Sequence, residues 1–188
     1  MLNIWRTDVS GGNLKQVSDG KVDQNPVCSP DGRWVLYQDT VHSGRLMKVP
    51  IDGGKPEQIS DELTAGFDIS PDSKTIALAA FGHLDDHVEK LTLLSADSNQ
   101  VLKVLEFERP RSGPIRFSRD AKAVVYPFRH GGVDDLWVQP LDGSSGKQIT
   151  DFKSEHIIDF HWSFDGSKLG VIRGHTDSDV VLIRDSQP

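Results

Sequence analysis

The side chains best suited to chemistry in this sequence are histidines, and most of them occupy one place in a repeating pattern. Five of the seven fall in successive links between predicted strands. They are His42, His83, His87, His130 and His175. Imidazole titrates at about pH 6.5 and is a common metal ligand. The five loop histidines could therefore form a rim on one face of the protein that responds to pH or contacts a metal ion. The alternative is a set of polar loop residues with no shared ligand.

A sixth histidine, His161, alternates with Phe160 and Trp162 along a predicted strand and therefore faces away from both. It could line a central channel, or it could hydrogen-bond to a neighbouring sheet. A separate group of arginines, which could grip an acidic partner or belong to a solvated loop, consists of Arg109, Arg111, Arg116 and Arg119. The six histidines are the candidate binding residues.

Motifs of enzymes and cofactor sites are absent from the sequence. It contains no Gly-x-Ser-x-Gly nucleophile elbow, no phosphate-cradling glycine loop before a helix, no His-Glu-x-x-His and no EF-hand loop. The single cysteine, Cys28, excludes an internal disulfide, and no Cys/His cluster has zinc-ligand spacing. We therefore predict a protein that is not an enzyme, with no catalytic residues, no cofactor and no metal site.

Composition narrows the class of protein further. Acidic residues outnumber basic ones by 28 to 21, which gives a formal charge of −7 and argues against a nucleic-acid binder. Hydrophobic residues make up 36% and charged residues 26%, as in a soluble globular protein. No apolar run approaches the roughly 20 residues of a membrane span, and the first residues lack the features of a signal peptide.

The elements that must position the histidines are set by an internal repeat. Ser29-Pro30-Asp31-Gly32 recurs as Ser70-Pro71-Asp72-Ser73, Ser118-Arg119-Asp120-Ala121 and Ser163-Phe164-Asp165-Gly166, with the serines 41, 48 and 45 residues apart. Two more phrases keep step with the first, namely the Asp-Gly-Gly type seen at 52–54 and the Gln-Ile-Ser/Thr-Asp type seen at 58–61 and 148–151. Such a period is the signature of a repeat architecture.

Each repeat has the pattern of a four-stranded antiparallel meander. Apolar residues alternate before each serine, at Pro26 and Cys28, Phe67 and Ile69, Ile115 and Phe117, and Phe160 and Trp162. A second run of β-forming residues follows each serine, and Ser-Pro-Asp-Gly suits the tight turn between them. Two more short strands complete the unit. We therefore predict an all-β protein, a β-propeller of about four four-stranded blades in a partial or self-completing ring.

The same phrases resemble the TolB-type, or WD40-like, propeller repeat of bacteria over essentially the whole chain. The last quarter, with Leu136-Trp137-Val138-Gln139 and Asp179-Val180-Val181-Leu182, is most similar to the C-terminal propeller of bacterial membrane-anchored Ser/Thr protein kinases. This resemblance implies a sensory or partner-binding region of a larger bacterial signalling protein, and it favours a periplasmic location.

The chain reads as one propeller region over residues 1–188. Its repeats are predicted at approximately 2–44, 45–87, 88–132 and 133–178, with a closing strand at 179–188. The register is that of a piece of a larger ring or of half a ring that pairs with a second copy. The strand ending near Val17 could also complete the sheet of residues 156–184. Unpaired sheet edges attract partners, so we expect self-association.

Three functional hypotheses follow from repeats without catalytic motifs. The first is a non-catalytic module that binds a protein or peptide. The second is an accessory propeller of a prolyl-oligopeptidase-type peptidase or a channel-centred enzyme. The third is a structural repeat whose partner is a second copy of itself.

Overall fold

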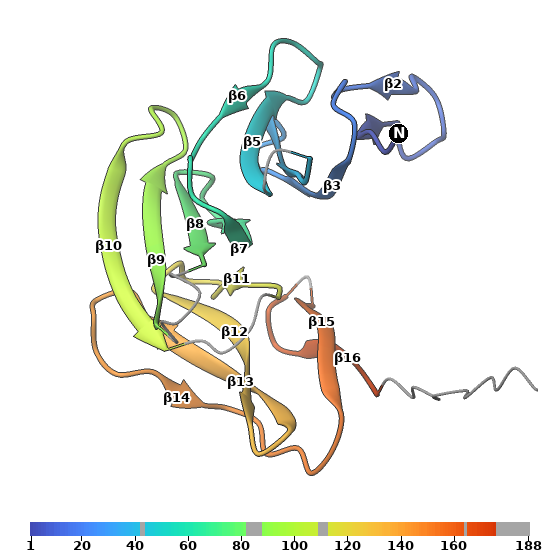
Figure 1. The fold of residues 1–188 in the computed structure, drawn as a ribbon. Helices are drawn as coiled ribbons and strands as arrows, with labels where there is room; N and C mark the ends of the chain where they lie inside the picture. The colour runs from blue at the N-terminus through green and yellow to red at the C-terminus, as the bar shows by residue number, and fades with distance from the viewer. Residues whose placement is uncertain (42–43, 82–87, 109–112, 164, 176–188) are drawn as a thin grey trace, which may run out of the picture.

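The computed structural model describes residues 1–41, 44–81, 88–108, 113–163 and 165–175, and within them the chain is built from β-strands joined by turns (Figure 1). The first hairpin pairs β1 (Trp5–Arg6) with β2 (Lys15–Gln16). The first four-stranded sheet contains β3 (Asp23–Cys28), β4 (Trp34–Asp39), β5 (Arg45–Pro50) and β6 (Glu57–Gln58). The second contains β7 (Thr64–Ile69), β8 (Thr75–Ala80), β9 (Val88–Ser95) and β10 (Val101–Glu108).

The third four-stranded sheet contains β11 (Arg116–Phe117), β12 (Ala123–His130), β13 (Val133–Pro140) and β14 (Lys147–Gln148). The last described strands, β15 (His156–Trp162) and β16 (Leu169–Gly174), pair with each other. In each four-stranded sheet the strands lie in chain order and every pair is antiparallel. The predicted all-β class and the four-stranded meander are therefore confirmed. The described residues include no helix that is long and apolar enough to cross a membrane.

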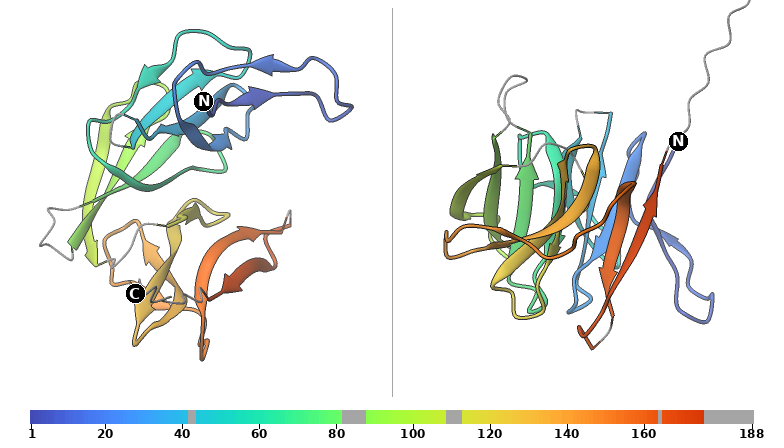
Figure 2. Two further views of the ribbon diagram at one scale, coloured as in Figure 1. Left: turned by 45° about the vertical axis from the view of Figure 1, so that its right-hand side comes forward. Right: turned by 90° about the horizontal axis from the view of Figure 1, so that it is seen from below.

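The sheets stand side by side in a curved row, with their first strands toward the inside of the curve (Figures 1 and 2). The inner strands β3, β7 and β11 contact one another in succession, and β13 contacts β15. The row is open, because the β1–β2 hairpin and the β15–β16 sheet are separate sheets at its two ends. The closing strand predicted at 179–188 lies outside the described residues.

The recurring serine and the aspartate two residues after it hold each turn between a first and a second strand by the same three hydrogen bonds. In the second sheet, Ser70 Oγ donates to Asp72 Oδ1 at 2.6 Å and accepts from the N–H of Thr75 at 2.9 Å. Asp72 Oδ1 also accepts from the N–H of Lys74 at 3.1 Å. The equivalent bonds recur at Ser29, Ser118 and Ser163. The repeated phrase is therefore a repeated turn structure.

Side chains between successive sheets form the core. Leu36 and Leu46 of the first sheet pack with Phe67 and Leu78 of the second. Two further clusters fill the next two interfaces, one around Leu91, Ile115 and Tyr126 and one around Val125, Leu136, Ile157 and Phe160. Burial on both faces explains the unbroken apolar runs in the second strands β4, β8 and β12.

The amino-terminal hairpin packs onto the first sheet. Ile4 and Val17 are buried against Val35, Tyr37 and Val49. Residue Val17, which we expected could complete the sheet of residues 156–184, therefore lies at the opposite end of the row in this structure. Its burial with Ile4 against the first sheet removes apolar surface from water.

Candidate functional site

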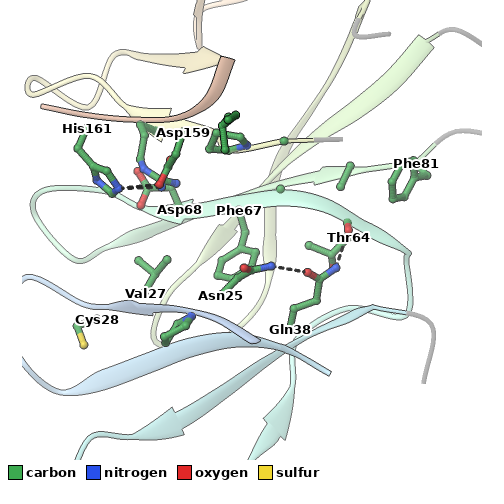
Figure 3. Close-up of a pocket in the computed structure, with 17 residues that line it drawn as sticks. Asn25, Val27, Cys28, Gln38, Thr64, Phe67, Asp68, Phe81, Asp159 and His161 are labelled. Atoms are coloured by element: carbon green, nitrogen blue, oxygen red, sulfur yellow. Dashed lines mark hydrogen bonds and ion pairs between the residues drawn. The ribbon is translucent and has the colours of Figure 1, made fainter. Parts of the chain in front are cut away.

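The inner strands of the sheets surround a cavity of about 860 Å³ at the centre of the curve (Figure 3). All four repeats contribute to its lining, because residues of β3, β7, β11 and β15 line the cavity. Further residues come from beside these strands, among them Gln38 of β4 and Phe81 after β8. Volumes of a few hundred to about 1,000 Å³ are typical of ligand sites. The cavity is therefore our candidate site.

One position of the repeat supplies the central part of the lining. The residue two before each turn serine faces the cavity, and in the four repeats it is Val27, Asp68, Arg116 and His161. Side chains alternate along a strand, so the residue four before the serine lines the cavity as well. At that position stand Asn25, Gly66, Pro114 and Asp159. The repeat thus places a charged or polar group from several sheets around one space.

Irregular strand pairing accompanies this lining. The register shifts between Gln24 and Val27 in β3, between Thr64 and Gly66 in β7, and between Ile157 and Asp159 in β15. Asn25 adopts φ 55°, in the left-handed region that asparagine tolerates better than most residues. Bulges bend a strand and redirect its side chains, and they are frequent beside functional sites.

Arg116, Asp159 and His161 form a charged group on one side of the cavity. Arg116 Nη2 donates to Asp159 Oδ1 at 3.1 Å, and its other terminal nitrogen donates to the carbonyl of Ile115 at 2.9 Å. His161 Nε2 lies 3.2 Å from Asp159 Oδ2 and 3.4 Å from Arg116 Nη2. Asp159 therefore holds both partners in fixed orientations.

Asp68 is a second carboxylate on the cavity wall. Its Oδ2 accepts a hydrogen bond of 2.7 Å from the backbone N–H of Phe117 in the next sheet. Burial raises the pKa of Asp68 to about 6, against the opposing effects of the Phe117 N–H and of the nearby Arg116 charge. Arg116 is within electrostatic range of Asp68 but forms its ion pair with Asp159.

Neutral hydrogen-bonding groups lie apart from this charged group (Figure 3). Gln38 Nε2 donates to the carbonyl of Thr64 at 2.9 Å, and Asn25 Nδ2 donates to Gln38 Oε1 at 3.1 Å. Apolar side chains, among them Val27 and Phe67, complete the lining. The cavity therefore offers charges, amides and apolar surface to one ligand.

The structure places the predicted histidines as follows. His161 lines the cavity, as one of its two sequence interpretations proposed. His130 ends β12 and is exposed. His175 follows β16 and is exposed, and its Nδ1 lies 3.8 Å from Glu155 Oε1. His42, His83 and His87 lie outside the described residues, so the predicted rim stays a prediction.

Sequence reasoning missed Asp68 and Asp159 as cavity residues, and it considered Arg116 only as part of an arginine cluster. In the structure Arg116 points to the cavity while Arg119 lies near Gly166, and Arg109 and Arg111 fall outside the described residues. The signal was present as the positions two and four residues before each turn serine.

A metal site has no support among the described residues, where no group of three or more His, Cys, Asp or Glu side chains is arranged to hold an ion. Within the cavity, the two side chains most suited to metal binding, Asp159 and His161, both lie beside the Arg116 guanidinium. A fixed positive charge at that distance opposes a bound cation there.

Comparison with solved structures defines the class of this fold, which is a β-propeller of the TolB-like kind. TolB from Acinetobacter baumannii superposes with a TM-score of 0.73 at 21% identity, over 94% of this chain and 44% of that one. A protein from Agrobacterium tumefaciens provisionally named TolB gives 0.67 at 22% identity, over 93% and 64%. This chain therefore spans less than two thirds of either protein.

Enzymes also occur among the similar structures. An oligogalacturonate lyase from Vibrio parahaemolyticus gives a TM-score of 0.67 at 16% identity, over 92% of this chain and 52% of that one. No protein-family model and no curated protein sequence matches this chain. The similar solved structures confirm the predicted propeller fold.

Proposed function

We propose that this chain is a non-catalytic propeller module that binds a protein or peptide segment in its central cavity. The observation that carries the proposal is the lining, in which four equivalent repeat positions bring Val27, Asp68, Arg116 and His161 around one space. If these four positions served only to pack the inner strands, apolar residues would be sufficient at all of them. Polar side chains at three of them, Asp68, Arg116 and His161, fit recognition of a ligand better than they fit stability.

The larger context of the module follows from the sequence resemblance. The TolB-like repeat favours a bacterial, extracytoplasmic protein, and the similarity of the last quarter to kinase-linked propellers favours the sensory part of a signalling protein. Self-association is supported by exposed apolar side chains at the amino-terminal end of the row, such as Leu2 and Trp5, and by the open arrangement of the row. Sedimentation equilibrium tests this last point, and a strict monomer at tens of micromolar would contradict it.

The binding proposal is tested by selecting peptides from a random display library on the immobilised protein. Ile158→Arg adds bulk and charge at the cavity, where Ile158 lines the wall and is 61% exposed. Ile172→Arg is the matched control, because Ile172 is 58% exposed and does not line the cavity. We expect selected peptides to lose affinity for Ile158→Arg and to keep it for Ile172→Arg. Peptides that tolerate both substitutions, or a library that yields no binder, would contradict the proposal.

A second candidate function is a channel-centred enzyme or the accessory propeller of a prolyl-oligopeptidase-type peptidase. The specific observation in its favour is the pairing of His161 Nε2 with the Asp159 carboxylate at 3.2 Å, since a carboxylate that orients a histidine is common in general-base catalysis. The test is a screen for hydrolase and lyase turnover. An activity that is lost in His161→Ala would establish the enzyme and replace the binding module.

A further inference from the structure

Charges in the cavity are not balanced. Two carboxylates, Asp68 and Asp159, face one guanidinium, Arg116. Arg116 is occupied, because it donates to Asp159 at 3.1 Å and to the carbonyl of Ile115 at 2.9 Å. Among the described residues, Asp68 forms no ion pair, and its hydrogen-bond donors are the uncharged backbone N–H groups of Phe117, at 2.7 Å, and of Ile69. A carboxylate removed from water on a cavity wall is stabilised by an opposite charge that approaches from the open side.

We propose that Asp68 is the recognition point for a cationic side chain, a lysine or arginine of the bound peptide. The inference rests on the proposed function above and names the ligand's charge. The ligand ammonium or guanidinium would lie against the Asp68 carboxylate. Its aliphatic stem would pack on the half-buried Val27, since long basic side chains bury their methylene groups while the charged end finds a partner. The Gln38 amide is engaged by Thr64 and Asn25, but no described residue donates to Asn25 Oδ1, so this oxygen remains for an N–H of the peptide backbone.

Binding of such a ligand would depend on pH. The groups that face Asp68 from the neighbouring strands are Arg116, Asp159, His161 and Cys28. The pKa of Asp68 is raised to about 6, so its carboxyl becomes protonated as the pH falls below that value. A cationic ligand favours the ionised carboxylate and lowers its pKa. Affinity should therefore be full at pH 7.5 and weaken as the pH falls through about 6.

The test uses nuclear magnetic resonance on the isotope-labelled chain with three capped amino acids as probes. N-acetyl-lysine methylamide carries the charge, N-acetyl-norleucine methylamide has the same stem without it, and N-acetyl-glutamate methylamide reverses it. Their caps remove the terminal charges, so that any effect of charge comes from the side chain. We expect the lysine probe to shift the backbone N–H signal of Phe117 and the carboxyl signal of Asp68, and to bind at least about tenfold more tightly than the norleucine probe.

Two variants make the outcome specific. Asp68→Asn removes the charge and keeps an oxygen acceptor for the Phe117 N–H, so the inner strands should stay in place. Asp151→Asn is the control, because Asp151 is an exposed acid outside the cavity. Loss of lysine selectivity in Asp68→Asn alone supports the proposal. Selectivity that survives Asp68→Asn, equal binding of the lysine and norleucine probes, or no binding of the lysine probe overturns it. The display experiment with Ile158→Arg reports separately on the binding function, which can stand when this inference fails.

Discussion

The backbone N–H of Phe117 donates a hydrogen bond of 2.7 Å to the carboxylate of Asp68, which belongs to the preceding sheet. The carbonyl oxygen of Phe117 accepts a second bond, of 2.9 Å, from the indole Nε1 of Trp162 in the following sheet. Phe117 stands on an inner edge strand, where backbone groups have no strand partner on one side. Side chains from both neighbouring sheets therefore satisfy its backbone, and one of them belongs to the cavity wall.

Asp68 should make stability depend on pH. Its folded-state pKa of about 6 lies above the value near 4 of an unfolded chain, so between these values the folded state binds more protons. Stability contributed by this group is therefore greatest at low pH and falls as the pH rises toward 6. We predict that Asp68→Asn stabilises the protein by about 1–2 kcal/mol at pH 7.5, because solvent screens part of the effect at this partly exposed carboxylate. The gain should shrink toward zero between pH 6 and pH 4.

Urea unfolding of the wild type and of Asp68→Asn, measured at several pH values, checks this prediction. Asp151→Asn serves as the control for loss of a surface charge. A stability difference that does not vary with pH would show that Asp68 has an ordinary pKa.

The turn serines should differ in their contribution to stability according to burial. Ser70 is fully buried, and its hydroxyl accepts from the N–H of Thr75 and donates to Asp72. Ser70→Ala leaves that N–H without its acceptor, which should cost about 1–3 kcal/mol. Ser163 makes the same bonds but is only partly buried, so water can replace its hydroxyl in Ser163→Ala. Thermal and urea unfolding should give a clearly smaller loss for Ser163→Ala, and equal losses would contradict the burial argument.

Lys48 should be the most important polar link between the first two sheets. It is almost fully buried, and its ammonium donates to the carbonyl of Ala96 at 2.9 Å and to Asn99 Oδ1 at 2.8 Å. The ammonium also lies 4.6 Å from the ring centre of Trp34. Lys48→Ala removes these contacts and leaves a cavity, so we predict a loss of about 2–5 kcal/mol in unfolding free energy.

Lys103 provides the matched comparison for Lys48. It makes a similar bond of 2.7 Å to the carbonyl of Leu141 in the third sheet, but it is only partly buried. Lys103→Ala should cost about 1 kcal/mol. A Lys48→Ala variant as stable as Lys103→Ala would mean that water replaces the buried ammonium.

The sequence predicts the sheets well because the turn chemistry is local. Serine, aspartate and the residue in the left-handed conformation act within five positions of one another, so each copy of the phrase specifies its own hairpin. Ser73 and Ala121 even adopt this conformation where the first copy has Gly32, at φ 61° and 56°. Local physics is enough at these places, because no distant residue is needed to form the turn.

The cavity is harder to predict because its residues are far apart in the chain. The alternation around Phe160 and Trp162 places His161 on the opposite face of its strand. This alternation does not reveal that Asp68 and Arg116 line the same cavity as His161, since that depends on how three sheets pack together. The position of Val17 is hard to predict for the same reason, because it depends on tertiary packing against Val35 and Tyr37.

Four equivalent strand positions meet around one space, and the single natural cysteine can test this arrangement. Cys28 is exposed and lies among the cavity residues, so a nitroxide can be attached there without other substitutions. Paramagnetic broadening of backbone N–H signals then reports proximity. We predict strong broadening at Asp68, Arg116 and His161, and weak broadening in the outer strands β10 and β14. Broadening confined to the first sheet, with Arg116 and His161 unaffected, would contradict a shared central cavity.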